Sequence, residues 1–472
     1  MPERDCLETG FGRDAHLVGD QRTGHVAHSI GRAQPRQTMA ITEAVSRRSP
    51  PARMLAAAGV VTAVFVLSNA PTPLYVRWQS QLGFSSSTLT ALFSVYIAGL
   101  LATLAIAGQC ADRFGSRAVL VPGLGAGMVA CVLFATAESV PALLVARFVS
   151  GIAVATAITA GMASVMELGG AARRRMAALL ASTSLVLGAA LGPLLAGSCA
   201  LALDRPSEAV FSTELAILSA TVLLVQALPF APDAPPSRAW RPHWPSVPRQ
   251  SRMHIAVGIS AFGCAMSCTA FVLSLGPSVL AQLNGVTNPL VAGAMACAMF
   301  ITATLAQLPA RRAPVRVILR LSFVAIILGM AALVIAVATS LASALLIGAM
   351  FAGAGHGLAQ LAGLTLIGLY VPEQRRAEAT AVLNIGGYVP CGLMPILTGL
   401  LVDRTSLAFG TTCFAVGMTL IAVGSWLFVR RALRLIPPVR SPMTGAAVPR
   451  SASEHHSALC NQLDGPLPQR RA

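Results

Sequence analysis

The segment Gly108-Gln109-Cys110-Ala111-Asp112-Arg113-Phe114-Gly115-Ser116-Arg117 lies between two long apolar runs and gives the strongest single indication of the fold. Gly108 permits two helix ends to approach closely, because it has no side chain. Asp112 is placed to cap a helix start or to pair with an arginine. Arg113 and Arg117 are four residues apart and share one helix face. The segment therefore predicts a polar turn with basic anchors between two helices.

Apolar runs of membrane-crossing length continue on both sides of this turn. Hydrophobic residues make up 55% of the 472 residues and charged residues only 11%, whereas an average soluble domain carries about 25% charge. In lipid such runs must be helices, because every backbone polar group needs an internal partner. The composition excludes an ordinary soluble enzyme and predicts an all-α polytopic membrane protein. Its twelve transmembrane helices are expected near 54–76, 86–107, 118–137, 141–167, 175–201, 209–230, 254–280, 288–309, 315–338, 341–369, 377–401 and 406–430.

The arginines are distributed unequally between the two sets of loops. The chain has 34 basic and 18 acidic residues, and every basic residue is Arg. With the N-terminus inside, the inner segments hold most of them, and the outer loops hold only Arg77, Arg205 and Arg404. Cytoplasmic loops of membrane proteins are enriched in Arg and Lys. We therefore expect a multi-pass protein of the bacterial inner membrane with both termini cytoplasmic. The arginines form no single basic face, so no nucleic-acid partner is expected.

Composition divides the chain into five parts. Residues 1–53 are polar and predict a disordered cytoplasmic tail, within which Met39 is the expected translation start. A six-helix bundle is expected over 54–230 and a second one over 254–434. The cytoplasmic linker 231–253 between them contains several prolines, which prevent a regular helix. Residues 435–472 are rich in Pro and Ser and predict a disordered cytoplasmic tail.

The turn at 108–117 resembles motif A of the major facilitator superfamily, GxLaDrxGrkxx, with departures at Cys110 and Ser116. The positions that match are Gly108, Ala111, Asp112, Arg113, Gly115 and Arg117. The resemblance covers about 54–434 and implies two six-helix bundles with pseudo-two-fold symmetry and a substrate site where they meet. It also implies that motif A gates the alternating access of that site, with Glu167 as its partner.

Two further segments resemble motifs of the same superfamily. Residues 143–153 look like motif B, in which Arg147 and Gly151 match and Ser150 replaces the usual Gln. Residues 188–197 resemble motif C, which the family associates with drug–proton antiporters. The residues that match motif C are Gly188, Gly192, Pro193 and Gly197. These glycines are interpreted in two compatible ways, as sites of tight helix packing or as a hinge for alternating access.

Few ionisable side chains lie inside the predicted spans, and each is expensive to bury. Arg147 is expected to act in proton transfer or in holding an anionic substrate, unless it snorkels to the outer surface. His356 is a candidate proton carrier or a hydrogen-bonded packing residue, and Gln360 shares its helix face. Glu214 is a candidate proton-binding carboxylate or an interfacial cap. Three polar residues, Asn69, Asn384 and Tyr388, are candidates for lining a cavity.

The pattern as a whole predicts a secondary active transporter of small, moderately apolar solutes that works by proton-coupled efflux. No Asp or Glu lies at the middle of spans one, two, four, seven or ten, so proton coupling rests on Glu214, His356 or Arg147. No phosphate-binding GxxxxGK[ST] or catalytic HExxH motif occurs, so ATP coupling and enzymatic activity are not expected. We expect a monomer in the lipid bilayer, without metal or cofactor. The alternatives are uptake of a small metabolite or organic anion, and a non-transporting membrane sensor.

Overall fold

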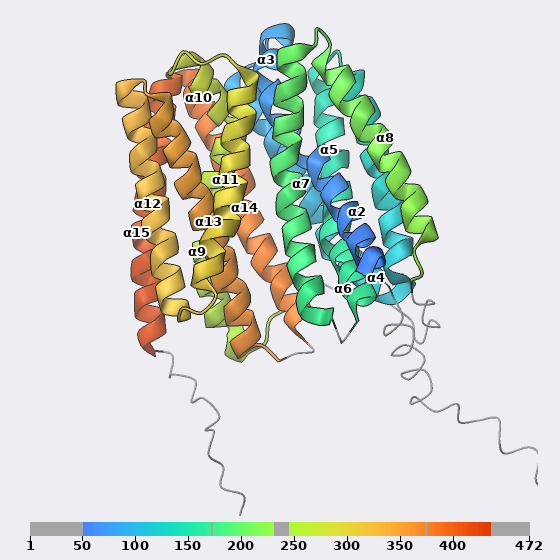
Figure 1. The fold of residues 1–472 in the computed structure, drawn as a ribbon. Coiled ribbons are helices and arrows are strands. Elements are labelled where there is room, and N and C mark those ends of the chain that lie inside the picture. Colours follow the sequence, from blue (N-terminus) through green and yellow to red (C-terminus); the bar gives the residue numbers. More distant parts are fainter. Residues whose placement is uncertain (1–50, 171–172, 231–244, 373–374, 436–472) are drawn as a thin grey trace, which may run out of the picture.

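The computed structural model describes residues 51–170, 173–230, 245–372 and 375–435. Within these ranges the regular elements are helices that run up and down through one bundle (Figure 1). They are α2 (Pro51–Asn69), η1 (Thr72–Leu74), α3 (Tyr75–Leu82), α4 (Ser86–Ala135), α5 (Val140–Thr156), η2 (Ala157–Gly161), α6 (Met162–Gly169), α7 (Arg174–Ala202), α8 (Pro206–Ala227), η4 (Arg249–Ser251), α9 (Arg252–Ser274), α10 (Gly276–Gln282), α11 (Pro289–Ala310), α12 (Val315–Thr339), α13 (Ala342–Tyr370), α14 (Arg376–Arg404) and α15 (Leu407–Leu435).

Twelve helical stretches in the described part of the chain are long and apolar enough to cross a membrane. Their bounds follow the predicted spans closely: the fourth is Val140–Gly169 and the ninth is Val315–Thr339. The predicted all-helical membrane fold is therefore confirmed. The two predicted tails and most of the linker, at 1–50, 231–244 and 436–472, lie outside the described residues.

Two predicted spans end earlier as helices than the sequence indicated. The first was expected to continue to 76, but α2 ends at Asn69 and a short 3-10 turn with Pro71 at its cap follows. The seventh was expected to continue to 280, but α9 ends at Ser274 and Pro277 lies in the first turn of α10. Proline has no backbone N–H and clashes with the preceding turn. Both chain breaks therefore follow from prolines that a count of apolar residues overlooks.

The second and third spans are joined without a loop, at the turn that motif A predicted. The helix α4 passes through both spans, and only Gly115 inside it has non-helical angles, with φ 82° and ψ 158°. A side chain is strained at such a positive φ, whereas glycine adopts it freely. Gly115 is therefore the residue at which the chain reverses direction between the two spans.

Both described chain ends lie at one end of the bundle, which we call the tail end (Figure 1). The opposite end, which holds α3 and α10, is called the far end. We call α2–α8 the first half and α9–α15 the second half. Contacts between the halves run mainly through two helix pairs, α7 with α11 and α4 with α14. Both pairs make their closest described contacts toward the far end.

The α4–α14 seam, the contact of these two helices at the far end, is closed by a carboxylate. The Oδ1 atom of Asp403 accepts a hydrogen bond of 2.8 Å from the backbone N–H of Ser86, and Oδ2 accepts one of 3.0 Å from that of Ser87. About two turns deeper in α4, the Ser94 hydroxyl donates to the Gly392 carbonyl at 2.7 Å. The first-turn N–H groups of a helix have no partner inside the helix. Asp403 therefore caps α4 from the other half of the molecule.

Candidate functional site

A cavity of about 320 Å³ lies between the two halves. Its walls come from α2, α4, α7, α9, α11, α13 and α14, together with the η2–α6 segment. Toward the tail end it reaches Gln307 near the end of α11 and Thr380 in the second turn of α14. At the far end the halves are in direct contact, through the α4–α14 seam and through α7 and α11. The cavity therefore extends toward the tail end only.

The cavity brings together most of the polar residues that the sequence singled out. Asn69, His356, Gln360, Asn384 and Tyr388 all line it. Sequence reasoning missed Thr269 and Gln307, which line the cavity as well. The signal for Gln307 was its amide inside an apolar run.

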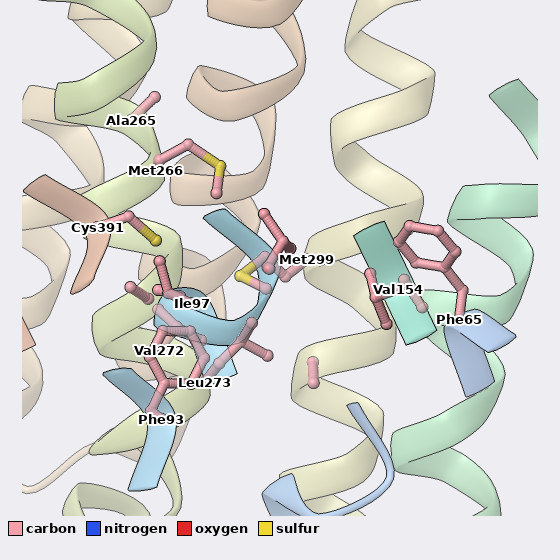
Figure 2. Packing of buried hydrophobic residues seen from close by; sticks show 14 of the residues in the cluster. Phe65, Phe93, Ile97, Val154, Ala265, Met266, Val272, Leu273, Met299 and Cys391 are labelled. Carbon is pink, nitrogen blue, oxygen red and sulfur yellow. The ribbon is translucent and has the colours of Figure 1, made fainter. Parts of the chain in front are cut away.

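The first-half wall of the cavity is mainly apolar. Phe65 on α2, Phe93 and Ile97 on α4, and Met162 on α6 contribute to it, and its polar groups are Ser68, Asn69 and Tyr96. The amide nitrogen of Asn69 already donates to the Ser68 hydroxyl at 2.7 Å. Figure 2 shows Phe93 and Ile97 gathered with Met266 and Leu273 of α9 and Cys391 of α14.

The second-half wall carries hydrogen-bonding groups that have no partner within the protein. The side chains of Gln307, Gln360, Asn384 and Tyr388 line the cavity and form no hydrogen bond with any described residue. His356 is different, because its Nδ1 lies 3.2 Å from the Thr269 hydroxyl and its ring meets the Phe262 ring edge-on. Four uncharged polar groups on this wall are therefore available to a solute.

Arg147 does not line the cavity and is held inside the first half. Its side chain is only 2% exposed, which contradicts the interpretation that it snorkels to the surface. One guanidinium nitrogen donates to the Ser68 carbonyl at 2.9 Å and another donates to the Tyr75 hydroxyl. The guanidinium also lies over the rings of Tyr75, Tyr96 and Phe134. These contacts tie α5 to α2 and satisfy much of a charge that is costly to bury.

Glu214 is fully buried in α8, away from the cavity. Its side chain has no exposed area, and neither carboxyl oxygen has a hydrogen-bond partner among the described residues. The interfacial-cap interpretation is therefore wrong, since a cap would accept a bond from the first helical turn. A buried carboxyl group without partners is costly in its charged form.

Motif A lies at the tail end and is only partly described. Arg117 donates to the carbonyls of Leu228 and Gln226, at 2.5 and 3.2 Å, at the C-terminal end of α8. A Cβ added at Gly108 would meet no atom of the described residues within 4 Å, so the close approach predicted there does not occur among them in this conformation. The Asp112 side chain lies outside the described residues. The role of Glu167, in the last turn of α6, as the partner of motif A stays a prediction.

The glycines of motifs B and C lie where helices touch. A Cβ added at Gly188 or Gly192 would lie 2.3 Å from the Thr62 carbonyl or 2.2 Å from the Val66 carbonyl of α2. One added at Gly151 would lie 2.2 Å from the Tyr96 carbonyl of α4, and one at Gly197 would lie 2.8 Å from the Pro289 carbonyl of α11. Close packing accounts for all four glycines, and the hinge role stays a prediction.

A glycine of the second half makes a matching close contact between α7 and α11. A Cβ added at Gly293 of α11 would lie 2.3 Å from the Pro193 carbonyl of α7. We call this contact, together with Gly197 against Pro289, the α7–α11 seam. No group of three or more His, Cys, Asp or Glu that could hold a metal ion occurs among the described residues.

Comparison with known proteins shows which family has this architecture. The sequence profile of the Major Facilitator Superfamily matches residues 52–343 and 257–457. The chain belongs to the Major Facilitator Superfamily. Membership of it agrees with the twelve candidate membrane spans and with the cavity between the halves described above.

Similarity to individual relatives in the superfamily is more limited. Over 169 residues the chain is 29% identical to the multidrug resistance protein MdtL of Escherichia coli O81 (strain ED1a). This match covers 34% of this chain and 42% of the relative. It is 37% identical to MdtL of Escherichia coli (strain K12 / DH10B) over 76 residues, 16% of this chain and 19% of the relative. The chain thus matches less than half the length of these curated relatives.

Two solved structures show the same fold. A bacterial homologue of the human lysosomal transporter Spinster, in an inward-facing and unoccupied conformation, matches with a TM-score of 0.64 at 15% identity, over 83% of this chain and 99% of that one. A D-xylose–proton symporter matches with a TM-score of 0.61 at 16% identity, over 80% and 98%. At sequence identities this low, the structural similarity shows a shared fold and does not indicate the substrate.

Proposed function

We propose that this transporter exports small, moderately apolar solutes across the bacterial inner membrane by alternating access, in exchange for protons. The observation that carries the proposal is the cavity between the halves, closed at the far end and extended toward the tail end. Its volume of about 320 Å³ lies within the usual range for small-molecule sites. The partial similarity to multidrug resistance proteins supports export rather than uptake.

The direction of the proposal depends on which side the tail end faces. The arginines between the predicted spans gather in the segments at this end, which favours a cytoplasmic tail end with both termini inside. The cavity would then face the cytoplasm, the side from which an exporter takes up its solute. A monomer suffices for this cycle, because one chain supplies both walls of the cavity.

We propose that His356 carries the proton, and we rank Glu214 as the second candidate for this role. A carrier must be reached from water, and His356 lines the cavity whereas Glu214 has no exposed area in this conformation. His356 also lies on the wall that carries the free amides, so a bound solute and a proton would compete for the same surroundings. Glu214 would take part only if the helices around α8 separate during the cycle.

The test is proton and solute flux in proteoliposomes of purified protein, with a pH-sensitive dye inside and an imposed pH gradient. We expect proton movement when a transported solute is added, and its loss in His356→Gln with binding of the solute retained. Glu214→Gln tests the second candidate in the same assay. Arg205→Gln, at the exposed far end, serves as the control and should transport normally.

The alternatives give different results in that assay. Solute movement without proton movement would contradict the antiport proposal and indicate facilitated transport or exchange. Accumulation in the opposite direction would indicate uptake. Saturable binding without any flux would favour a sensor that has kept the transporter fold.

A further inference from the structure

We propose that the cavity selects uncharged ring compounds with a hydrogen-bonding group at one edge, and excludes organic cations and anions. This inference rests on the proposed function and specifies its solute. The ring would lie against the apolar first-half wall, and the polar edge would face the amides of the second half. The argument uses the charges around the cavity, its free polar groups and their placement.

The described residues that line the cavity include no Asp, Glu, Arg or Lys. An ion that enters such a cavity loses much of its hydration and finds no opposite charge to replace it, and this costs several kcal/mol. An organic anion would need charge-assisted bonds from an arginine, but Arg147 does not line the cavity, and two of its guanidinium nitrogens donate to Ser68 and Tyr75. With His356 neutral, the lining therefore disfavours both signs of charge.

Cations meet an additional penalty from the first half. The guanidinium of Arg147 lies 5.6 Å from the ring centroid of Tyr96, and Tyr96 itself lines the cavity. A fixed positive charge behind the wall repels a second one in a medium of low dielectric constant. Glu214, a negative group when charged, does not line the cavity.

The free polar groups define what the solute must offer. Gln307, Gln360 and Asn384 each carry an amide with both donor and acceptor atoms, and Tyr388 adds a hydroxyl. These side chains have no hydrogen-bond partner among the described residues, so a neutral amide, ketone or hydroxyl group would satisfy them without loss of internal bonds. All four belong to the second half, on α11, α13 and α14.

The opposite wall fits a ring rather than a second polar group. Phe65 and Phe93 of the first half face the cavity together with Ile97 and Met162. Aromatic and sulfur-containing side chains pack well against a flat ring. The second half lines the cavity with apolar side chains as well, so the two walls differ in their unpaired polar groups, and these groups give a bound solute one preferred orientation.

The test is equilibrium binding to purified protein in lipid nanodiscs, with empty nanodiscs subtracted. Four probes share one ring: N-(1-naphthyl)acetamide is neutral and polar, 1-ethylnaphthalene is neutral and apolar, 1-naphthoate is an anion, and (1-naphthylmethyl)trimethylammonium is a cation. We expect saturable binding of the neutral amide, and binding of both ions that is at least tenfold weaker. 1-Ethylnaphthalene should bind more weakly than the amide because it lacks the polar edge.

Variants assign the orientation. Gln360→Leu and Asn384→Leu should each weaken binding of the amide by about threefold to tenfold, the value of one net hydrogen bond, and leave binding of 1-ethylnaphthalene unchanged. Gln282→Leu is the matched control, because Gln282 is exposed in α10, outside the cavity, and should bind every probe as the parent protein does.

Equal or tighter binding of either ion, no saturable binding of the amide, or an equal loss of both neutral probes in Gln360→Leu and Asn384→Leu would overturn the inference. The assay contains no gradient and measures no flux. Failure of proton coupling in proteoliposomes would therefore leave this result intact, and the two proposals can fail separately.

Discussion

Arg147 shows how a charge is tolerated inside this membrane protein. The side chain is buried, yet backbone and phenol oxygens accept from it and three aromatic rings surround it. The residue that replaces the usual Gln of motif B, Ser150, donates to the Arg147 carbonyl at 2.8 Å. At the scale of single residues, the first half therefore holds one buried cation by hydrogen bonds and aromatic contacts.

Removal of one partner of that cation should destabilise the protein. Tyr75→Phe deletes the hydroxyl that accepts from Arg147, and a hydrogen bond to a charged group contributes about 2 kcal/mol. We expect a lower midpoint of thermal unfolding in detergent, measured by tryptophan fluorescence, since Trp78 packs against Tyr75. Tyr388→Phe is the control, because its hydroxyl has no partner within the described residues. Equal midpoints for Tyr75→Phe and the parent protein would contradict this account of Arg147.

A second residue-scale prediction concerns the glycines of motif C. Gly192→Ala should destabilise the protein strongly, because its Cβ would lie 2.2 Å from the Val66 carbonyl and α2 would have to move away from α7. Gly125→Ala is the matched control in α4, where an added Cβ meets no atom within 4 Å. Thermal unfolding of both variants checks the difference. Similar midpoints for the two would show that α2 and α7 are not held as closely as described.

The sequence predicted these residues better than it predicted their surroundings. Motifs B and C identified glycines that lie at helix contacts. Five of the suggested polar residues line one cavity. The partners of Arg147 were beyond reach, because Ser68 and Tyr75 lie 79 and 72 positions away along the chain. Burial also separates Glu214 from His356, and a sequence pattern alone does not tell a cavity wall from a sealed interior.

At the scale of elements, the spans were predictable because membrane-crossing runs are a matter of composition and length. Helix ends were less predictable, and prolines 71 and 277 ended α2 and α9 early. Asp403 went unnoticed, because an acidic residue after an apolar run resembles a loop residue. Its role as a cap depends on Ser86, which is 317 positions away.

The cap on α4 makes an element-scale prediction. Asp403→Ala should expose the first turn of α4, since Ser86 and Ser87 would lose the acceptors of their N–H groups. Hydrogen exchange followed by mass spectrometry should show faster exchange in the peptide that contains these serines. Glu208→Ala is the control at the same end, because its salt bridge to Arg205 is exposed and local. Unchanged exchange in Asp403→Ala would mean that the α4–α14 seam is held by other contacts.

At the scale of the whole molecule, alternating access requires the far end to open. The two seams are the contacts that would have to separate, while the contacts within each half are kept. The Asp403 cap is well suited to this, because its hydrogen bonds to backbone amides can be replaced by water.

Locking the far end should therefore stop transport. Ser87→Cys and Asp403→Cys, introduced together after removal of the ten native cysteines, place a thiol on each side of the α4–α14 seam. Bridging them with a short cleavable thiol reagent should abolish solute flux in proteoliposomes, and reductive cleavage should restore it. Each single cysteine variant controls for simple modification. Full flux with the bridge in place would contradict the rocking of one half against the other.

The unequal walls of the cavity have a consequence for how this protein could diverge. Because the unpaired amides all belong to the last six spans, the choice of solute is encoded largely in one portion of the gene. A chimaera that joins the first six spans of this chain to the last six of a relative would inherit the recognition pattern of the relative. New specificities could then arise by recombination, while the buried arginine and its aromatic surroundings pass on unaltered.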